Sequence, residues 1–452
     1  MPSLDPARVI RSQVVLEEHD VSADGRYAVI VRRFVAGKRY RSHLWLVPLA
    51  EPGRPRRLTS GPVRDTRPRL SPDGRAVAFK RTDEPPRGRA GSRSSTGKRR
   101  AHTPATPRDR VLVLPLADGR PGRPFAIRTP RDRAVSELAW SPDGRRLALA
   151  MQAEEERFLV GRRPAPEADE APLARRITRI DWRYDESGHL DHWDHLFVVD
   201  ARPGATPVQL TDGDWGVADV AWSPAGDQIA FTADPRPEAD LRPRRSIWAV
   251  AVPAPGAAPA RRLGQPREVL ALGGDTYAPA WSPDGRWLSA VGFVPPDPLD
   301  DESPTLVVGP AGGGAPPQVI APELDRPFGA WIDTDLFGWT APSRTTPAWA
   351  GPTTIVAVVG DRGQALPWRF EIDPMTGGAV GRPGPMLAGE VATHSLAVAA
   401  LSEVPKDRRV TVLACLGSRP LELVVVPLRE APGGSTTTPT QPPVPRPRTS
   451  LG

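Results

Sequence analysis

Short apolar runs separated by turn residues fill this chain, and one combination of run and turn recurs. The most complete copy is SELAWSPDGRRLALA at 136–150, in which one apolar segment ends at Trp140 and a second begins at Leu147. The intervening Ser-Pro pair stops strand pairing because proline has no N–H, and the Asp-Gly pair that follows reverses the chain. Each copy therefore predicts a β-hairpin.

The other copies share the turn serine and the apolar flanks: VSADGRYAVIV at 21–31, LSPDGRAVAFK at 70–80, WSPAGDQIAFT at 222–232 and WSPDGRWLSAV at 281–291. Two more segments, WIDTDLFGWTA at 331–341 and LSEVPKDRRVTVLA at 401–414, keep the apolar flanks without the full turn, and we interpret them as degenerate copies. A lone hairpin is marginal in water, so repeated hairpins predict units that bury their faces against each other.

A third apolar run follows each hairpin and is rich in the branched and aromatic residues that strands prefer. These runs are HLWLVPL (43–49), RVLVLPL (110–116), HLFVVD (195–200), SIWAVAV (246–252), TLVVGP (305–310), WRFEID (368–373) and LELVVVPL (421–428). Several units add a fourth run, as in RRLTSG at 56–61. Four antiparallel strands repeated seven times predict an all-β fold, a seven-bladed β-propeller.

The repeats predict one propeller domain over residues 1–430. A basic loop at 82–109 and an insertion at 151–193 in the third unit interrupt it, and the Pro/Thr-rich tail at 431–452 is expected to be disordered. The seventh unit lacks an obvious fourth run after Leu428. We expect Ala7 to Ile10 to supply that strand from the other end of the chain.

Composition agrees with a folded β-protein. The 452 residues include 57 Pro and 41 Gly, which call for many turns and few long helices. The single cysteine, Cys415, excludes an intrachain disulfide and lies in an apolar run, which predicts a buried thiol. The first residues have no apolar segment typical of a signal peptide, and the chain has no apolar run of twenty residues. We expect a cytoplasmic protein without membrane contact.

The net charge of +7 raises the question of a nucleic-acid partner. Much of the excess lies in the basic loop and its edge, at Arg87, Arg89, Arg93, Lys98, Arg99, Arg100, Arg108 and Arg110. No aromatic residue is interleaved there to stack on a base, so we interpret this stretch as a solvated loop and expect no nucleic-acid partner.

The block ITRIDWRYDESG at 177–188, HLFVVD, and QLTDGDWGVADVAWSPAGDQIAFT at 209–232 resembles the propeller half of the prolyl oligopeptidase (S9) family of serine peptidases. The acylaminoacyl-peptidase and dipeptidyl-aminopeptidase-like branch is the most similar. The WSPDG phrase is shared with WD40-like repeats of the TolB type, whereas the longer block is more specific. The resemblance spans roughly residues 10–430.

This resemblance implies a two-part enzyme in which a propeller admits peptides and an α/β-hydrolase domain cleaves them. No serine in this sequence lies in a G-x-S-x-G elbow, and no Ser, Asp and His triad can be assembled from the segment after Leu428. We therefore expect a chain that is not an enzyme by itself, with a separately encoded α/β-hydrolase domain or a peptide substrate as partner. The alternative is a free-standing TolB-like scaffold for protein or peptide binding.

Candidate sites are few. In dipeptidyl-peptidase relatives, a Tyr with paired acidic residues anchors the substrate's amino terminus, so the resemblance implies a peptide contact at Arg183, Tyr184, Asp185 and Glu186. A structural hairpin is the alternative for that segment.

Metal and cofactor sites are not expected. His189, His192 and His195 have ligand chemistry but unsuitable spacing for an extended segment, so no metal site is predicted. No cofactor is expected, and an enzyme with a central metal is not expected because no set of His, Asp and Glu recurs at the blade starts to line the axis. The repeated tryptophans are expected to pack between blades.

Overall fold

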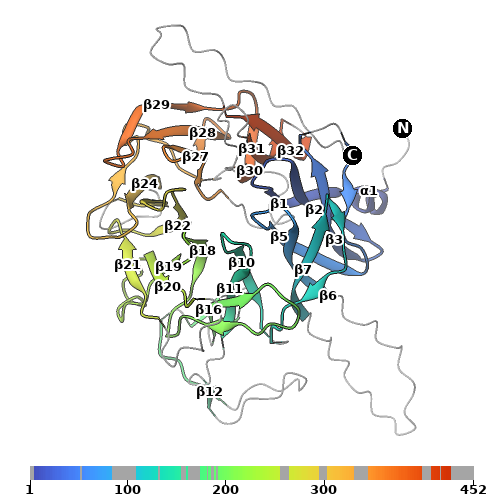
Figure 1. Ribbon diagram of the computed structural model, residues 1–452, viewed down its shortest axis with the longest axis horizontal. Coiled ribbons are helices and arrows are strands. Elements are labelled where there is room, and N and C mark those ends of the chain that lie inside the picture. The colour runs from blue at the N-terminus through green and yellow to red at the C-terminus, as the bar shows by residue number, and fades with distance from the viewer. Residues whose placement is uncertain are drawn as a thin grey trace.

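The computed structural model describes residues 5–50, 53–83, 108–130, 133–153, 159–160, 174–180, 182–184, 188–189, 192–254, 264–294, 303–329, 345–399, 409–417 and 419–428. The described chain is β-structure apart from one short helix, α1 (Pro6–Ser12). The strands form antiparallel groups arranged in a ring (Figure 1), and each group is named after the strand nearest the centre of that ring.

Separate four-stranded sheets form the β10, β18 and β22 groups. The β10 group contains β10 (Val135–Trp140), β11 (Arg146–Ala153), β16 (Trp193–Asp200) and β17 (Val208–Gln209). The β18 group contains β18 (Ala218–Trp222), β19 (Gln228–Ala233), β20 (Ser246–Ala251) and β21 (Arg267–Leu270). The β22 group contains β22 (Thr276–Trp281), β23 (Trp287–Gly292), β24 (Thr305–Pro310) and β25 (Gln318–Val319).

The other groups are joined in pairs, each pair by a parallel bridge: Ser42 to Arg64 and Ala365 to Ala392. The β1 group contains β1 (Val14–Val21), β2 (Tyr27–Ala36), β3 (Arg39–Pro48) and β4 (Arg56–Arg57). The β5 group contains β5 (Val63–Leu70), β6 (Ala76–Asp83), β7 (Arg108–Ala117) and β9 (Phe125–Ala126). The short strand β8 (Arg120–Pro121) pairs with the end of β7. The β26 group contains β26 (Ala348–Trp349), β27 (Thr354–Asp361), β28 (Gln364–Ile372) and β29 (Ala379–Pro385), and the β30 group contains β30 (Val391–Ala399), β31 (Arg409–Leu416) and β32 (Arg419–Pro427).

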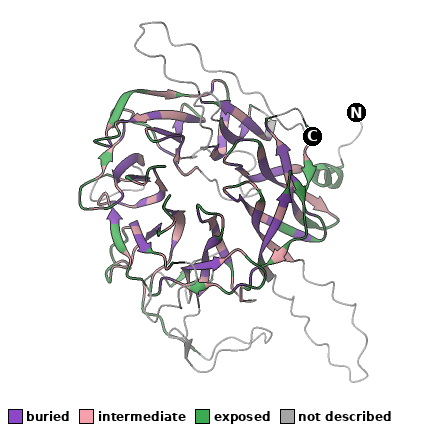
Figure 2. Cartoon of the chain, in the orientation of Figure 1, coloured by how far each residue is buried: buried purple, intermediate pink, exposed green. Residues whose placement is uncertain are grey.

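The predicted all-β architecture of repeated four-stranded antiparallel sheets is confirmed. The hydrophobic core lies between the faces of neighbouring groups (Figure 2), as where Val111 and Val113 of β7 pack in one cluster with Leu147 and Leu149 of β11. Each such side chain contributes about 1.5–3 kcal/mol relative to its exposed state. Since no group buries both faces alone, the ring is the unit that is stable.

The recurring turn is closed by its serine. In the β10 group the Ser141 N–H donates to the Arg146 carbonyl at 2.9 Å, and the Arg146 N–H donates to Ser141 Oγ at 2.9 Å. The Ser141 hydroxyl donates to Asp143, while Gly144 supplies the positive φ of 67° that the turn requires. A Cβ at Gly144 would also lie 3.7 Å from Pro72 of the preceding group, so consecutive turns pack together.

At four junctions a tryptophan at the end of the inner strand links two groups. Its indole N–H donates to a backbone carbonyl of the preceding inner strand in each of four pairs: Trp140 to Arg69 at 2.9 Å, Trp222 to Ala139 at 3.2 Å, Trp281 to Ala221 at 3.1 Å and Trp349 to Ala280 at 3.1 Å. The expected packing of tryptophans between neighbouring units is confirmed, with a directional bond added to it.

The sixth innermost strand differs from the expectation. Residues 331–341, interpreted as the degenerate sixth copy, lie outside the described residues. The strand that occupies this place in the ring is β26, which ends at Trp349, and the Ala350 N–H donates to the Thr354 carbonyl in the manner of the other turns. The sequence AWAGPTT at 348–354 escapes the pattern because it lacks the serine and the Asp-Gly pair.

The predicted strand at Ala7 to Ile10 is wrong. These residues form α1, whose N-cap Asp5 accepts a hydrogen bond from the Ala7 N–H at 3.0 Å and whose first turn contains Pro6. Asp at the N-cap and Pro at N1 favour a helix start over a strand. In the described chain β32 pairs only with β31, so the two ends of the ring do not share a sheet.

Other expectations fall partly outside the described chain. Cys415 is buried, as predicted. Strand β6 ends at Asp83 and β7 begins at Arg108, so the edges of the basic loop belong to strands, while 84–107 and the tail at 431–452 are not described. Among the described residues, no helix has the length and apolar character needed to cross a membrane.

Candidate functional site

The inner strands other than β26 each carry a register irregularity a few residues before the strand ends. The shifts lie between Leu16 and His19, Thr66 and Arg69, Val135 and Glu137, Ala218 and Ala221, Tyr277 and Ala280, and Thr393 and Ser395. A β-bulge of this kind breaks the alternation of a strand and re-aims a side chain. Here the residue four before the turn serine is directed to the centre of the ring.

That repeat position holds Glu18, Arg67, Glu137, Asp219 and Ala278, and all of these residues line one central pocket. Three of these residues have a positive φ: 53° at Arg67, 53° at Asp219 and 58° at Ala278. A non-glycine residue at positive φ is uncommon and stores strain. The position is therefore maintained by the surrounding bonds of the ring.

Those bonds come from the carboxylates at the same repeat position. Glu18 accepts from the Arg67 N–H at 3.2 Å, and Glu137 accepts from the N–H groups of Asp219 at 2.9 Å and Val220 at 3.0 Å. Asp219 in turn accepts from the Ala278 N–H at 3.1 Å. Each carboxylate thus holds the bulge of the next group around the ring. The expectation that no set of His, Asp and Glu recurs to line the axis is wrong, because Glu18, Glu137 and Asp219 line the channel from one repeat position.

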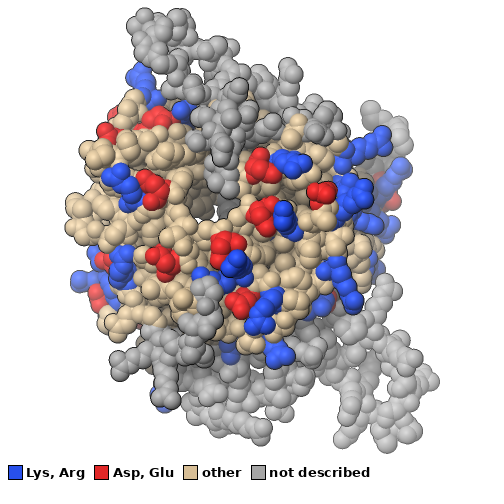
Figure 3. Space-filling view, in the orientation of Figure 1, with Lys and Arg blue, Asp and Glu red and all other residues tan. Residues whose placement is uncertain are grey.

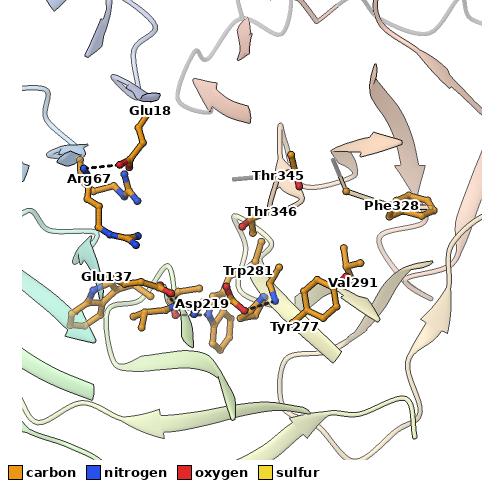
Figure 4. A pocket seen from close by; sticks show the side chains of 18 of the residues that line it. Glu18, Arg67, Glu137, Asp219, Tyr277, Trp281, Val291, Phe328, Thr345 and Thr346 are labelled. Atoms are coloured by element: carbon orange, nitrogen blue, oxygen red, sulfur yellow. Dashed lines mark hydrogen bonds between the residues drawn. The ribbon is translucent and has the colours of Figure 1, made fainter. Parts of the chain in front are cut away.

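The central pocket has a volume of about 740 Å³. Figure 4 shows a charged side, with Glu18, Arg67, Glu137 and Asp219, facing a side where Tyr277, Val291 and Phe328 lie. The two sides differ because Ala278 replaces the charged residue at the repeat position of the β22 group. In Figure 3 the opening of the channel is visible at the centre of the ring, with acidic and basic side chains close together around it.

Burial sets the electrostatics of the pocket. Burial, followed by the nearby negative charge of Glu137, raises the pKa of Asp219, while hydrogen bonds from Thr232 and from the Ala278 N–H oppose the rise. Burial also raises the pKa of the Tyr277 hydroxyl to about 12. Tyr277 is therefore a neutral hydrogen-bond donor and acceptor at physiological pH.

Several polar groups of the pocket are not used by the fold. The Arg67 guanidinium, the Tyr277 hydroxyl and the hydroxyls of Thr345 and Thr346 form no hydrogen bond or ion pair with the described part of the chain. All four residues are half-buried, so these groups are accessible to water or to a ligand in the channel. The channel thus combines unused donors with an apolar wall, the composition of a ligand-binding pocket. Among the described residues that line the channel, none is Ser, His or Cys.

The sequence-predicted contact at Arg183, Tyr184, Asp185 and Glu186 is only partly described. Arg183 and Tyr184 form β14 (Arg183–Tyr184), which pairs with β15 (Gly188–His189), and Arg183 is exposed. Asp185 and Glu186 lie outside the described residues. None of the four lines the central pocket as described.

The segment just before this hairpin is anchored to the ring. Arg179 donates to the Asp214 carbonyl at 2.8 Å and lies over the Trp193 ring, with its guanidinium carbon 4.8 Å from the ring centroid. The Ile180 N–H donates to Asp240 Oδ2 at 2.8 Å. These bonds place residues 174–180 against the β10 and β18 groups. Ile177 and Ile180 remain exposed.

The three histidines are placed as separate features. His195 is buried in β16, where its ring contacts Trp215 and its Nδ1 lies 3.3 Å from Thr211 Oγ1. His192 precedes that strand and His189 belongs to β15. In the described residues no three His, Cys, Asp or Glu side chains are grouped as metal ligands.

Comparison with known protein families and with curated proteins finds no match. Solved structures match at the level of fold. An acylaminoacyl peptidase in complex with Z-Gly-Gly-Phe-chloromethyl ketone matches with a TM-score of 0.60 at 13% identity, over 98% of this chain and 53% of the peptidase chain. This chain therefore spans about half the length of that peptidase.

Two shorter structures match over most of their length. The β-propeller domain of the Trilobed protease from Pyrococcus furiosus, described as having an open velcro topology, matches with a TM-score of 0.53 at 14% identity, over 93% of this chain and 97% of that domain. Oligogalacturonate lyase in complex with manganese matches with a TM-score of 0.55 at 14% identity, over 92% and 91% of the two chains. At these identities the likeness shows a propeller fold, and activity must be argued from the site. The expected similarity to acylaminoacyl-peptidase propellers is confirmed at this level.

Proposed function

We propose that this chain is a seven-bladed β-propeller that serves as the non-catalytic, substrate-gating and partner-docking part of an S9-type oligopeptidase in the cytoplasm. Its partner is an α/β-hydrolase domain on a separate chain, which supplies the nucleophile. The fold similarity to acylaminoacyl peptidases and to an isolated protease propeller supports this proposal. The seven blades correspond to the seven strand groups named above.

The observation that carries the proposal is the set of unused polar groups in the channel. An extended peptide presents carbonyl acceptors and N–H donors along its length. The Arg67 guanidinium and the Tyr277 hydroxyl can donate to its carbonyls, and the wall at Val291 and Phe328 accommodates an apolar side chain. The peptide part of the inhibitor in the matching acylaminoacyl peptidase, Z-Gly-Gly-Phe, has these features and is a suitable probe.

Isothermal titration of the full chain with Z-Gly-Gly-Phe tests the proposal. We expect saturable binding with Kd in the micromolar to millimolar range, weakened about 3- to 10-fold by Arg67→Ala and by Tyr277→Phe, since each lost hydrogen bond contributes about 0.5–1.5 kcal/mol. Arg128→Ala, an exposed arginine after β9, is the matched control and should leave Kd unchanged. Absence of binding, or equal binding by all variants, would reject the channel as the peptide site.

Arg183, Tyr184, Asp185 and Glu186 form a second proposed peptide contact, for the amino terminus of the peptide. Carboxylates gain a charge-assisted bond from an ammonium group. The double substitution Asp185→Asn with Glu186→Gln should weaken binding of a peptide with a free amino terminus and leave the amino-blocked Z-Gly-Gly-Phe unaffected. Equal affinities of the wild type and the variant for the free peptide would remove this contact from the proposal.

The missing nucleophile has its own test. A fluorophosphonate probe should leave this chain unlabelled, and adding a chain with a G-x-S-x-G elbow encoded nearby should restore hydrolysis of a chromogenic peptide ester. A labelled serine in this chain would contradict the non-catalytic role. Peptide binding without any restored hydrolysis would favour the alternative, a free-standing TolB-like scaffold for proteins or peptides.

A further inference from the structure

A second pocket lies where the β1 and β5 groups meet, and we call it the junction pocket. It has a volume of about 220 Å³ and shares no residue with the central channel. Tyr27 at the start of β2 and Leu46 and Pro48 at the end of β3 line it from the β1 group, and Asp118 and Gly119 line it from the β5 group. The junction pocket is therefore a feature separate from the proposed peptide site.

A tight turn of the β5 group forms one side of the junction pocket. Asp118 and Gly119 join β7 to β8, with φ values of 49° and 71°, the two positive values of a type I′ hairpin turn. A Cβ on Gly119 would lie 3.1 Å from Leu46 Cδ2 and 3.4 Å from Tyr27 Cζ, so the turn packs closely on the β1 group. This contact fixes the side of the pocket that the β5 group supplies.

Three exposed arginines line the junction pocket, all from the β1 group: Arg26, Arg54 and Arg56. The guanidinium carbon of Arg26 lies 5.7 Å from the centroid of the Tyr27 ring, and Arg56 Nη1 donates to the Gly119 carbonyl at 3.1 Å. The Arg54 guanidinium forms no hydrogen bond or ion pair with the part of the chain that the structure describes. Its donors are therefore open to a ligand.

The charge of the junction pocket favours a ligand with two negative charges. Asp118 is the one carboxylate among the described residues that line it, and within the described chain this carboxylate forms no ion pair with the three arginines. Three guanidinium groups and one carboxylate leave two positive charges in excess. A phosphate monoester carries about −1.5 to −2 at pH 7, and guanidinium groups bind phosphate oxygens in a bidentate manner.

The junction pocket also offers an apolar surface beside the arginines. Tyr27, Leu46, Pro48 and Ala50 contribute it. The volume of about 220 Å³ is several times the ≈ 30 Å³ that one water molecule occupies. It therefore leaves room for a small organic group next to one phosphate.

A comparison within the chain shows that the repeat alone does not supply these residues. The loop phrase PGRP occurs at 52–55 in the β1 group and again at 121–124 in the β5 group, so Arg123 corresponds to Arg54. In the β5 group, however, Ala76 stands at the position of Tyr27 and Phe125 at that of Arg56. The combination of arginines and tyrosine belongs to the β1 group, and Arg123 is a matched control for Arg54.

We propose that the junction pocket binds a small phosphate monoester, with Arg26, Arg54 and Arg56 on the phosphate and the organic group against Tyr27 and Leu46. This inference goes beyond the proposed peptide function and does not depend on it, since the two sites have no residue in common.

Isothermal titration of the full chain with phenyl phosphate tests this site. We expect saturable binding with Kd in the micromolar to millimolar range. Arg54→Ala should raise Kd about tenfold, because hydrogen bonds between ionised groups are the stronger class. Arg123→Ala, also exposed, should leave Kd unchanged. Absence of saturable binding, or equal weakening by both variants, would overturn the proposal.

Two further ligands test the chemical class. Benzoate has the same ring and only one negative charge, and inorganic phosphate has the charge without the ring, so each should bind about three- to tenfold more weakly than phenyl phosphate. Benzoate binding as tightly as phenyl phosphate would reject a phosphate site. Inorganic phosphate binding as tightly would reject the contact with an organic group.

A channel variant separates this site from the proposed peptide site. Arg67→Ala should leave the Kd of phenyl phosphate unchanged, and Arg54→Ala should leave the Kd of Z-Gly-Gly-Phe unchanged. Phenyl phosphate binding that is lost in Arg67→Ala and retained in Arg54→Ala would place the anion in the channel and contradict the junction pocket.

Discussion

Single side chains join one strand group to the next in this ring. At four junctions a tryptophan at the end of the inner strand donates backward to a carbonyl. At three junctions a carboxylate four residues before the turn serine accepts from the group ahead. Trp222 shows the first bond and Glu137 the second. Because both belong to the same repeated phrase, a phrase that predicts a hairpin also builds the junction between hairpins.

The indole bond can be tested by a substitution that retains an aromatic ring. Trp222→Phe keeps an aromatic ring and removes the N–H that donates to the Ala139 carbonyl at 3.2 Å. We expect the free energy of unfolding to fall by about 1–3 kcal/mol, the sum of a lost hydrogen bond and a partly filled cavity. Urea unfolding measures it. A variant as stable as the wild type would show that the indole bond does not support the junction.

The Asp219 carboxylate has a pH signature. Burial and then Glu137 raise its pKa in the folded protein, so its contribution to stability is present below the unfolded pKa and is lost as pH rises through the folded value. The Asp219→Asn variant has no carboxyl group to deprotonate and does not lose this stability. The free energy of unfolding of the variant minus that of the wild type should therefore rise as the pH rises above about 4. Asp200→Asn is the control, because Asp200 is half-buried at the end of β16 and paired with Arg202. A constant difference across pH would contradict the assignment.

For single residues, the sequence predicts the tryptophans at the junctions better than it predicts the residues that line the channel. Trp140 and its equivalents follow directly from the repeat. The channel residues do not, because strand alternation alone cannot reveal a bulge that turns Asp219 inward. The usable signal was the alignment of the turn serines, which places Glu18, Arg67 and Glu137 at one repeat position.

Among the elements, the β10 group carries the main insertion, and Arg179 anchors its described part. The Arg179 side chain contacts the ring of Trp193 and the carbonyl of Asp214, and these contacts hold residues 174–180 against the ring of strand groups. Ile177 and Ile180 stay exposed on this segment, so their side chains do not anchor it. Arg179 is the side chain that makes most of the anchoring contacts, beside the bond from the Ile180 N–H to Asp240.

Arg179→Ala should release this segment while leaving the ring intact. Limited trypsin digestion of the variant should cleave within 174–183 about tenfold faster, with the melting temperature changed by less than about 2 °C because few core contacts are lost. Arg176→Ala removes a neighbouring exposed arginine and a trypsin site, and should not accelerate cleavage. Unchanged cleavage of Arg179→Ala would show that other contacts hold the segment.

The sequence pattern predicts the bounds of some strands but not of others. Branched and aromatic runs located β16, β24 and β32, since strand propensity and burial coincide there. The chain start was predicted as a strand from its apolar residues, but Asp5 and Pro6 are helix-start residues, and the helix places Val9 and Ile10 in solvent. The short strand β26 was missed because its turn is closed without a serine.

For the whole molecule, the ring and its channel carry the functional argument. Repetition of one junction produces the ring. The residue four before the turn serine varies between groups, so the channel wall is charged at Arg67 and Asp219 and uncharged at Ala278. A structure of the same fold can serve a peptidase or a lyase, so the lining rather than the ring decides the ligand.

A crystal structure of the full chain with saturating Z-Gly-Gly-Phe tests the central claim most directly. The account predicts the peptide in the channel, with carbonyl oxygens within hydrogen-bond distance of the Arg67 guanidinium and the Tyr277 hydroxyl, and the phenyl side chain against Val291 and Phe328. A channel left empty at saturating peptide, or a peptide bound only on the outside of the ring, would contradict it.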